Sequence, residues 1–195
     1  MIKIFIAIIS LSLLYIANEY LHRKWKVKTY YTRKLVHVMS GIGAIVFSFI
    51  LDKNEFLLST AFFVVLFSFL FKLKVLRSVR TEGTIGEILY PISILILTIT
   101  LFDRQSLFIS GILILAISDT VSSFIGQKNT NTPKFLRSYF GHAVTTYIIL
   151  LFSSNPLTAF VISLILAFVE YYSYNGWDNL TVPLAYIALT TIFKI

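Results

Sequence analysis

The chain has 195 residues, of which 57% are hydrophobic, 16% aromatic and only 13% charged. Soluble domains are about half apolar and about a quarter charged, so this composition excludes a soluble domain and indicates an integral membrane protein. The net charge is +8, and the absence of cysteine excludes disulfides and thiolate metal sites.

Eight apolar runs of roughly membrane-crossing length follow one another along the chain. They predict an all-α, polytopic bundle of about eight transmembrane helices, forming one domain over residues 1–195. The first run lacks a small-x-small cleavage site, so we expect a span and not a signal peptide. Several runs are shorter than the roughly 20 residues that a bilayer core requires, so these helices should tilt little, thin the bilayer or end inside the protein. The expected spans are residues 2–20, 35–51, 56–71, 85–102, 107–125, 138–153, 157–174 and 180–195.

Basic residues are concentrated in the linkers after the first, third and fifth expected spans. These linkers carry 13 of the 17 Lys and Arg residues, and the opposite side carries only Lys3, Lys53, Arg104 and Lys194. The positive-inside rule therefore places the basic linkers in the cytoplasm and both termini outside. For the first and third linkers, attraction to anionic lipid head groups is the simplest additional role.

The second span begins with the segment YTRKLVHVMSGIGA. Arg33 and His37 are four residues apart and share a helix face, whereas Lys34 is expected to point aside. A basic belt that snorkels to the surface is the alternative role for the Arg-Lys pair. Gly41 and Gly43 indicate close packing against neighbouring helices.

The fourth span opens with TEGTIGEILYP. Glu82 should lie near water, where an acid complements the helix dipole. Glu87 already lies inside the apolar run, and an ionisable residue at that depth indicates a function. Pro91 is expected to kink this helix, whereas Pro183 lies near the start of the last span, where its missing N–H is harmless.

Asp119 lies in the fifth span, within the apolar stretch ILILAISDTVSSFIG. A carboxylate at such a depth costs about 2.5–3.5 kcal/mol on insertion scales, so it requires a compensating role. Ser122, Ser123 and Gly126 follow at helical spacing and form one polar stripe that ends at the cytoplasmic surface. The alternative is that Asp119 pairs with a basic residue only to hold helices together.

Candidate phosphate ligands follow this stripe. The next linker holds Lys128, Lys134 and Arg137 and leads to Ser138 and Gly141 at the start of the sixth span. Magnesium prefers carboxylate and phosphate oxygens, while Lys, Arg and helix N-termini donate to phosphates. The stripe and the linker therefore predict a site for a magnesium-bound phosphate compound.

The segment VEYYSYNGWDNLTVP adds Glu170, Asp178 and Asn179 on the same membrane side. Asp178 and Asn179 have an alternative role as caps of the last span, whereas Glu170 lies deeper in its span. The chain has no P-loop, no HExxH and no nucleophile elbow, so any nucleotide site is of a membrane-specific kind.

Five short motifs occur in the order RKxxH (Arg33, Lys34, His37), GExxYP (Gly86, Glu87, Tyr90, Pro91), DTxxSxxG (Asp119, Ser123, Gly126), RSxxG (Arg137, Ser138, Gly141) and Glu170 with DNLTVP (residues 178–183). In this order, and on one membrane side, they resemble the polyprenol kinase family, which includes dolichol kinases, phytol kinases and CTP-dependent diacylglycerol kinases. The likeness covers about residues 33–184, and DTxxSxxG and DNLTVP are its most specific parts.

The resemblance implies a multi-pass enzyme that moves the γ-phosphate of CTP, with Mg²⁺, onto the hydroxyl of a lipid alcohol at the cytoplasmic face. The expected partners are CTP, the alcohol and the bilayer, with no nucleic acid. In the family, activity is linked to the positions of Arg33, Lys34, Asp119 and Gly126. One departure concerns Arg137, because the family usually has lysine there and arginine keeps the charge but not the donor geometry.

Roles can be assigned within this mechanism. Charge on the transferred phosphoryl group must be neutralised by basic side chains, and either Glu87 or Glu170 would orient or deprotonate the alcohol. The expected catalytic residues are Asp119, Arg33, Lys34, Glu87 and Glu170; the nucleotide ligands are Lys128, Arg137, Ser138, Gly126, Gly141, Ser123 and Asn179; the metal ligands are Asp119 and Asp178; the substrate-binding residues are His37 and Tyr90.

Two other functions are compatible with these residues. A CTP-dependent cytidylyltransferase, which makes a CDP-lipid from a phosphorylated lipid, would use similar ligands and differ only in its products. A small cation-coupled transporter would bind its ion at Asp119 and Glu170. Its charges should reach both membrane faces, and none occurs in the outer halves of the expected spans.

Overall fold

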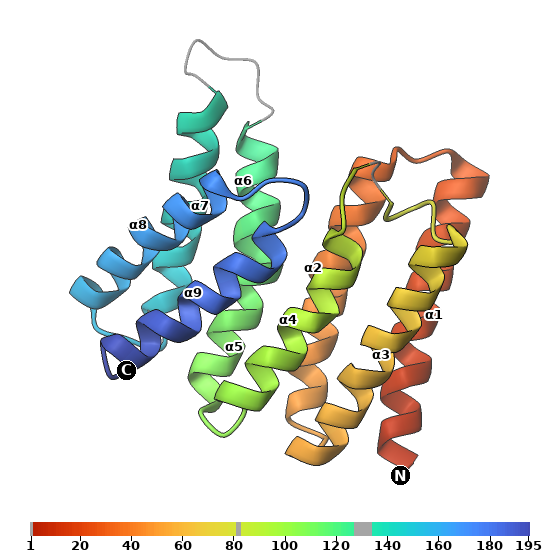
Figure 1. The fold of residues 1–195 in the computed structure, drawn as a ribbon, viewed down its shortest axis with the longest axis horizontal. Helices are drawn as coiled ribbons and strands as arrows, with labels where there is room; N and C mark the ends of the chain where they lie inside the picture. Colours follow the sequence, from red (N-terminus) through yellow and green to blue (C-terminus); the bar gives the residue numbers. More distant parts are fainter. Residues whose placement is uncertain (1, 81–82, 127–133) are drawn as a thin grey trace.

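The structure, a computed structural model, describes residues 2–80, 83–126 and 134–195, and over these residues it is helical with no strand. It has eight continuous helical segments, because α5, a π-helical turn and α6 form one rod (Figure 1). The all-α class and the eight expected helices are thus confirmed for the described residues. The elements are α1 (Ile2–Trp25), α2 (Thr29–Ser48), α3 (Lys53–Leu73), α4 (Gly86–Leu101), α5 (Gln105–Leu113), the π-turn (Ile114–Ser118), α6 (Asp119–Gly126), α7 (Lys134–Leu150), α8 (Pro156–Tyr172) and α9 (Asp178–Ile192).

Within the part of the chain that the structure describes, three helices are long and apolar enough to cross a membrane. They are α1, α3 and the α5–α6 rod (Gln105–Gly126), while α4 and α8 are apolar but shorter. Large hydrophobic side chains cover the outside of α1 and α3; Leu13 is 57% exposed and Val65 is 71% exposed. An outer surface of this kind is typical of proteins that contact lipid.

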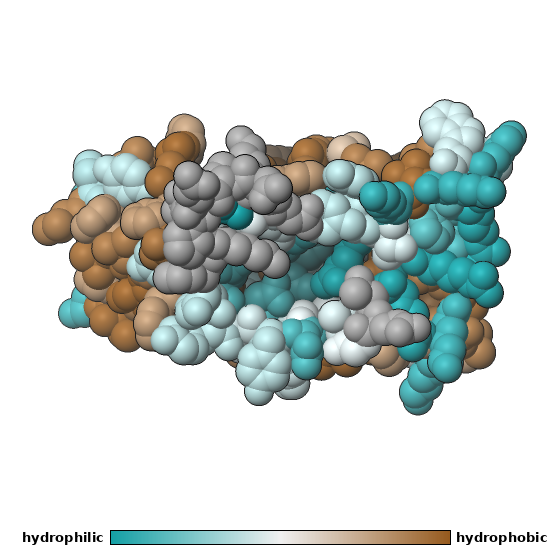
Figure 2. Space-filling view, turned by 90° about the horizontal axis from the view of Figure 1, so that it is seen from above, coloured by the Kyte–Doolittle hydropathy of each residue, from teal (hydrophilic) through white to brown (hydrophobic). Residues whose placement is uncertain are grey.

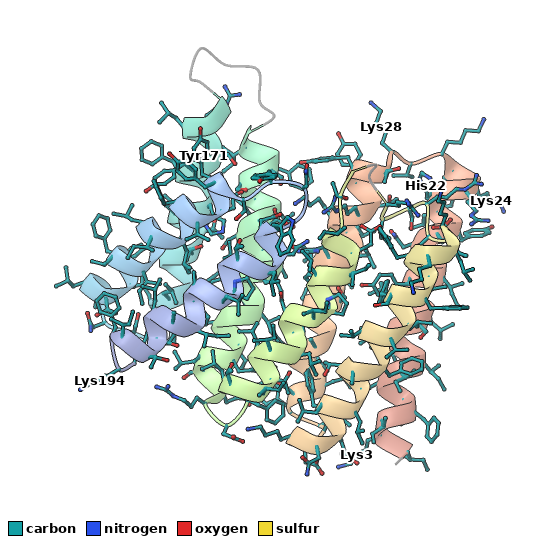
Figure 3. The ribbon with its side chains drawn as sticks, in the orientation of Figure 1. Lys3, His22, Lys24, Lys28, Tyr171 and Lys194 are labelled. Atoms are coloured by element: carbon teal, nitrogen blue, oxygen red, sulfur yellow. The ribbon has the colours of Figure 1, made fainter. Side chains whose placement is uncertain are left out.

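The two ends of the molecule differ in charge. Figure 1 shows both termini at one end, here called the terminal end, and the α1–α2, α3–α4 and α8–α9 linkers at the other, the linker end. Lys3 and Lys194 lie at the terminal end, whereas Lys24 and Lys28 lie at the linker end (Figure 3). Hydrophilic residues gather in the middle of the linker end and over its α1–α2 side, whereas hydrophobic residues predominate at the opposite side (Figure 2). The fold therefore brings the two basic linkers within the described residues, α1–α2 and α3–α4, to the same end, as the charge pattern requires.

The core lies where α4, α5, α8 and α9 meet. Leu97, Phe108, Ile162 and Tyr186 have no exposed surface, and the Tyr186 hydroxyl donates to the Leu107 carbonyl at 3.0 Å. In a membrane, such contacts stabilise helices through dispersion and hydrogen bonding, because lipid is as apolar as the side chains. This core supports the ends of α4 and α9, which reach the polar site.

Small residues bring α2 close to its neighbours. A Cβ at Gly41 would lie 2.6 Å from Ala116 Cβ on the π-turn, and one at Gly43 would lie 2.8 Å from Leu11 Cδ2 on α1. The close packing expected for these glycines is confirmed. At Gly41 it holds the middle of α2 against the π-turn of the rod, and at Gly43 it holds α2 against α1.

Pro183 stands inside α9, so the expectation that it lies harmlessly at the helix start is wrong. It is the sixth residue of α9, and its missing N–H would otherwise bond the carbonyl of Asn179. The Ser93 hydroxyl of α4 donates to that carbonyl instead. The proline therefore frees an acceptor that ties α9 to α4. Helix α4 itself continues through Pro91 to its end at Leu101.

Helices α4 and α9 run slantwise across the molecule in Figure 1. Their first turns lie inside the protein, where Gly86 and Asn179 are buried. The Asn179 side-chain amide donates to the Gly86 carbonyl at 3.1 Å, and the Ile85 N–H donates to the Asn175 carbonyl at 3.2 Å. The N-termini of both helices are thus joined.

Gly176 makes this junction possible. Its φ is +87°, and a Cβ there would lie 2.6 Å from the Gly86 backbone nitrogen. Gly83 also has a positive φ, +76°, but a Cβ there would have no neighbour within 4 Å among the described residues. The two glycines share a backbone conformation and differ in the space around them.

We expect Gly176→Ala to lower the stability of the protein by about 2–4 kcal/mol, because left-handed strain and overpacking add. Gly83→Ala should cost about 1 kcal/mol, from strain alone. Thermal unfolding of both variants in detergent measures the difference. Equal losses would show that the α4–α9 junction is not tightly packed.

Candidate functional site

The centre of the site is an ion pair between α2 and α6. Lys34 Nζ lies 2.8 Å from Asp119 Oδ2, and the side chains are only 12% and 16% exposed. His37 Nε2 lies 3.5 Å from the same oxygen. Burial strengthens the attraction between such charges and makes each of them costly without the other.

The expectation that Lys34 points aside is wrong. Successive residues of a helix are about 100° apart, which places His37 between Arg33 and Lys34 on the surface of α2. The long lysine side chain bridges the remaining angle to reach Asp119. One face of α2 therefore presents all three basic side chains of the segment.

The π-turn directly precedes Asp119. His37 Nε2 lies 3.1 Å from the Leu115 carbonyl in this turn, and because a carbonyl only accepts, Nε2 is the donor. π-turns insert an extra residue into a helix and often occur at functional sites. Here the turn offers α2 a buried backbone carbonyl as a hydrogen-bond acceptor and directly precedes the first residue of α6.

Three carboxylates from three helices line one small cavity beside the ion pair. Asp119 comes from α6, Glu170 from α8 and Asp178 from α9, and His142 of α7 completes the wall. Glu170 Oε1 accepts a hydrogen bond from the Ser122 hydroxyl at 2.8 Å. The acids that are far apart in the sequence thus converge at Asp119.

Asp178 and Asn179 do not cap α9 through their side chains. The N-cap residue of α9 is Trp177, and it makes no side-chain capping bond among the described residues. Asp178 is the first residue of the helix, and the Asn179 amide donates to Gly86 on α4 instead. The capping alternative is therefore wrong, and both side chains are directed to the interhelical site.

A second pocket opens on the other side of Asn179. Arg33, His37, Glu87 and Tyr90 line it. A Cβ on Gly86 would lie 2.6 Å from Arg33 Nη2, so the guanidinium lies directly against the first turn of α4. The basic side of α2 thus faces the acid at the start of α4.

Two buried oxygen atoms of this pocket have no hydrogen-bond partner within the part of the chain that is described. They are Glu87 Oε2 and Asn179 Oδ1. Buried polar atoms are nearly always paired in folded proteins, so each unpaired acceptor indicates a missing donor or cation. A ligand with a hydroxyl group, or a cation, would supply it.

His37 and Tyr90, the expected substrate-binding residues, form a wall of this pocket. The Tyr90 hydroxyl donates to the His37 carbonyl at 2.8 Å, and the ring centroids are 3.9 Å apart. Their polar groups join α2 to α4. Their rings are the parts that remain available to a ligand.

Other expected nucleotide ligands lie farther along the α6–α7 pair. Arg137 Nη2 donates to the Gly126 carbonyl at 3.0 Å, at the end of α6. That carbonyl is seven residues beyond Asp119, about 10 Å along the helix. Gly141 allows α7 to pack on α6. The half-buried Ser123 and Ser138 belong to the same stretch of the pair, and Lys128 and Glu82 lie outside the described residues.

Sequence reasoning did not single out His142 or the residues that position the α3–α4 linker. His142 is 1% exposed, and a histidine within an apolar run was the available signal. Glu19 Oε2 accepts from the Ser78 N–H at 2.9 Å, and the Thr32 hydroxyl donates to the Ser78 carbonyl at 2.6 Å. Ser78 thereby fastens the linker to α1 and α2, next to Arg33.

The donor set suits a cation that arrives with a phosphate ligand. Over the described residues, no group of three or more His, Cys, Asp or Glu side chains is arranged to hold a metal alone. Magnesium in nucleotide sites is held by one or two carboxylates and completed by substrate phosphates and water. Asp119 and Asp178, which line the same cavity, meet that requirement.

Comparisons of the chain with protein-family models, with curated proteins and with solved structures found no match. The fold and the site are therefore described by their own geometry. They define a helical bundle with a buried cluster of acids and bases at its linker end.

We expect Lys34→Met to destabilise the protein by about 3–5 kcal/mol, because it leaves the Asp119 charge buried without a partner. Asp119→Asn should destabilise the protein as well, because it leaves the Lys34 charge buried without a partner. The double variant Lys34→Met with Asp119→Asn removes both charges and should recover stability to within about 1 kcal/mol of the parent. Thermal unfolding of the four proteins in detergent tests this, and harmless single variants would contradict a buried pair.

Proposed function

We propose that this chain is a multi-pass membrane kinase that transfers the γ-phosphate of CTP to the hydroxyl of a polyprenol-type alcohol, of the dolichol, phytol or geranylgeraniol class. The observation that carries the proposal is the convergence of Arg33 and Lys34 with four carboxylates, beside two unpaired buried oxygens. The choice of CTP is supported by the resemblance of the five motifs to the polyprenol kinase family.

The phosphate-binding part of the proposal uses Arg33, Lys34 and two helix N-termini. The first turns of α4 and α9 are joined, so their positive dipole ends act at one place. Phosphate groups bind at such ends, and basic side chains add charge-assisted hydrogen bonds. This combination would hold a triphosphate and stabilise the charge that develops during transfer.

Asp119 and Asp178 would hold Mg²⁺ on the nucleotide, where the bound ion would neutralise part of the triphosphate charge. Lys34 balances Asp119 when no ligand is present. On binding, we propose that Lys34 turns to the phosphates while Asp119 faces the cation. Each buried charge then keeps an opposite charge beside it in both states.

Glu87 is the proposed base for the acceptor alcohol. Glu170 is engaged by the Ser122 hydroxyl, whereas Glu87 Oε2 is unpaired among the described residues and lines the pocket with Arg33. The hydroxyl oxygen forms a bond to the γ-phosphorus as the bond from that phosphorus to the bridging oxygen of CTP breaks. The hydroxyl proton passes to Glu87, and CDP leaves with the bridging oxygen.

The interior of the terminal half supports an enzyme over a transporter. Its buried polar side chains over the described residues are hydroxyl groups with hydrogen-bond partners. Thr98, Ser163 and Thr190 donate to carbonyls of their own helices, and Ser110 donates to the Ser153 hydroxyl. A cation pathway would need acids or open oxygens there. No observation favours the transporter.

Purified protein given CTP, Mg²⁺ and geranylgeraniol should release CDP and a lipid monophosphate. The Lys34→Met, Asp119→Asn double variant should stay folded and lose at least about a hundredfold in turnover, since electrostatic ligands of a transition state contribute that much or more. Phosphorus NMR and mass spectrometry identify the products. Release of pyrophosphate would indicate the cytidylyltransferase instead, and full activity of the double variant would exclude this site.

The proposed orientation places the linker end in the cytoplasm and both termini outside. The chain has no cysteine, so single cysteines can be introduced without background. Lys28 and Lys194 are both exposed and lie at opposite ends of the molecule, so each is suited to replacement by cysteine. In intact cells an impermeant maleimide should label position 194 at once and position 28 only after permeabilisation; the opposite result would reverse the orientation.

A further inference from the structure

An apolar pocket lies among α1, α2, α3 and α4, on the terminal side of the polar site. Ala7, Ala44, Phe56, Phe63 and Ile94 are among its walls, and it contains about 50 Å³ of free space. A single water needs only about 10–15 Å³, but it also needs polar partners. The pocket is therefore large enough for a bound molecule, and the polarity of its walls decides whether that molecule is water or a hydrocarbon.

The hydroxyl groups in the walls do not face the pocket with free donors. Ser59 donates to the Glu55 carbonyl at 2.9 Å, and Thr60 donates to the Phe56 carbonyl at 2.9 Å. Both acceptors belong to α3 itself, so the pocket offers little to water. A hydrocarbon is the occupant that such walls favour.

The apolar pocket adjoins the polar one. Tyr15, Phe67 and Tyr90 line both pockets, and the polar pocket holds Arg33 and Glu87. An amphipathic molecule with one polar end could therefore occupy both, with its polar end at Glu87. By contrast, the cavity beside Asp119 has only about 10 Å³ of free space, too little for a chain.

We propose that the apolar pocket binds the hydrocarbon tail of the acceptor alcohol next to its hydroxyl, and that α1 to α4 thereby select the substrate. This inference rests on the proposed function. Along α3 the walls run from Phe56 to Phe67, about 16 Å of helix, so the slot holds one chain in line with the bundle. The pocket contacts the part of the hydrocarbon tail nearest the hydroxyl, and the rest of a longer tail extends into the surrounding lipid.

A larger side chain in the apolar pocket should lower kcat/KM for long acceptor alcohols and leave kcat/KM for short ones unchanged. Thr60 lines the pocket and is 9% exposed, whereas Val65 on the same helix is 71% exposed. We expect Thr60→Phe to lower kcat/KM for geranylgeraniol by about tenfold or more, since pocket contacts of this size discriminate to that extent. Its kcat/KM for prenol, a single-isoprene alcohol, should stay within about twofold, as should both values for Val65→Phe.

Activity toward prenol also shows whether Thr60→Phe is folded. If this variant loses activity toward both alcohols, a second measurement, photolabelling of the pocket, decides. In that measurement a geranylgeraniol analogue with a photoreactive diazirine in its tail is irradiated with the protein in the absence of nucleotide. Peptides of α1, α2 and α3 at the pocket should be labelled, and excess geranylgeraniol should prevent the labelling. Thr60→Phe should lower the saturable labelling about tenfold, and Val65→Phe should not.

The two proposals can fail separately. Saturable labelling of the pocket without transfer from CTP would refute the kinase and leave the lipid site standing. Transfer from CTP with saturable labelling confined to α7 or α8, or equal loss of labelling in both phenylalanine variants, would overturn the pocket and leave the kinase.

Discussion

The structure depends on the burial of one negative charge in an apolar rod. Asp119 begins α6, in a helix that is long and apolar enough to cross a membrane, and it is balanced by Lys34 at 2.8 Å. Because neither charge is stable alone in such surroundings, α2 must lie against the rod at a fixed height. Gly41 permits the close approach, and the π-turn provides the carbonyl that His37 bonds.

Helices α4 and α9 complete the site with the residues of their first turns. The first turns of α4 and α9 lie inside the bundle and are joined through Asn179 and the glycines. They bring Glu87 and Asp178 into the two pockets on either side of Asn179, while α8 contributes Glu170. The result is a cluster in which acids and bases compensate one another. In the proposed function, the phosphates and the cation of a nucleotide would replace these internal partners, so that every buried charge would keep an opposite charge beside it.

Much of this arrangement is visible in the sequence. Apolar runs predict the eight helices, and Asp119, Glu87 and Glu170 are conspicuous because each interrupts such a run. The direction of Lys34 was not predictable from helix spacing, since a long side chain can cross the surface of its helix. The π-turn leaves no mark on hydrophobic periodicity, and the partner of Asn179 follows from the slant of α4 and α9, which is a tertiary property. Pro183 was misread because α9 begins at Asp178, directly after its N-cap Trp177. The proline is therefore the sixth residue of the helix, where its missing N–H frees a carbonyl for Ser93.

A structure of the protein with Mg²⁺ and a non-hydrolysable CTP analogue would show whether the buried ion pair is the nucleotide site. We expect triphosphate oxygens within about 3 Å of the donors of Arg33 and Lys34. We also expect Lys34 to be turned away from Asp119 and the cation to lie on the Asp119 carboxylate. Nucleotide bound elsewhere, with the Lys34–Asp119 pair intact, would contradict the account and reduce the pair to a link between helices.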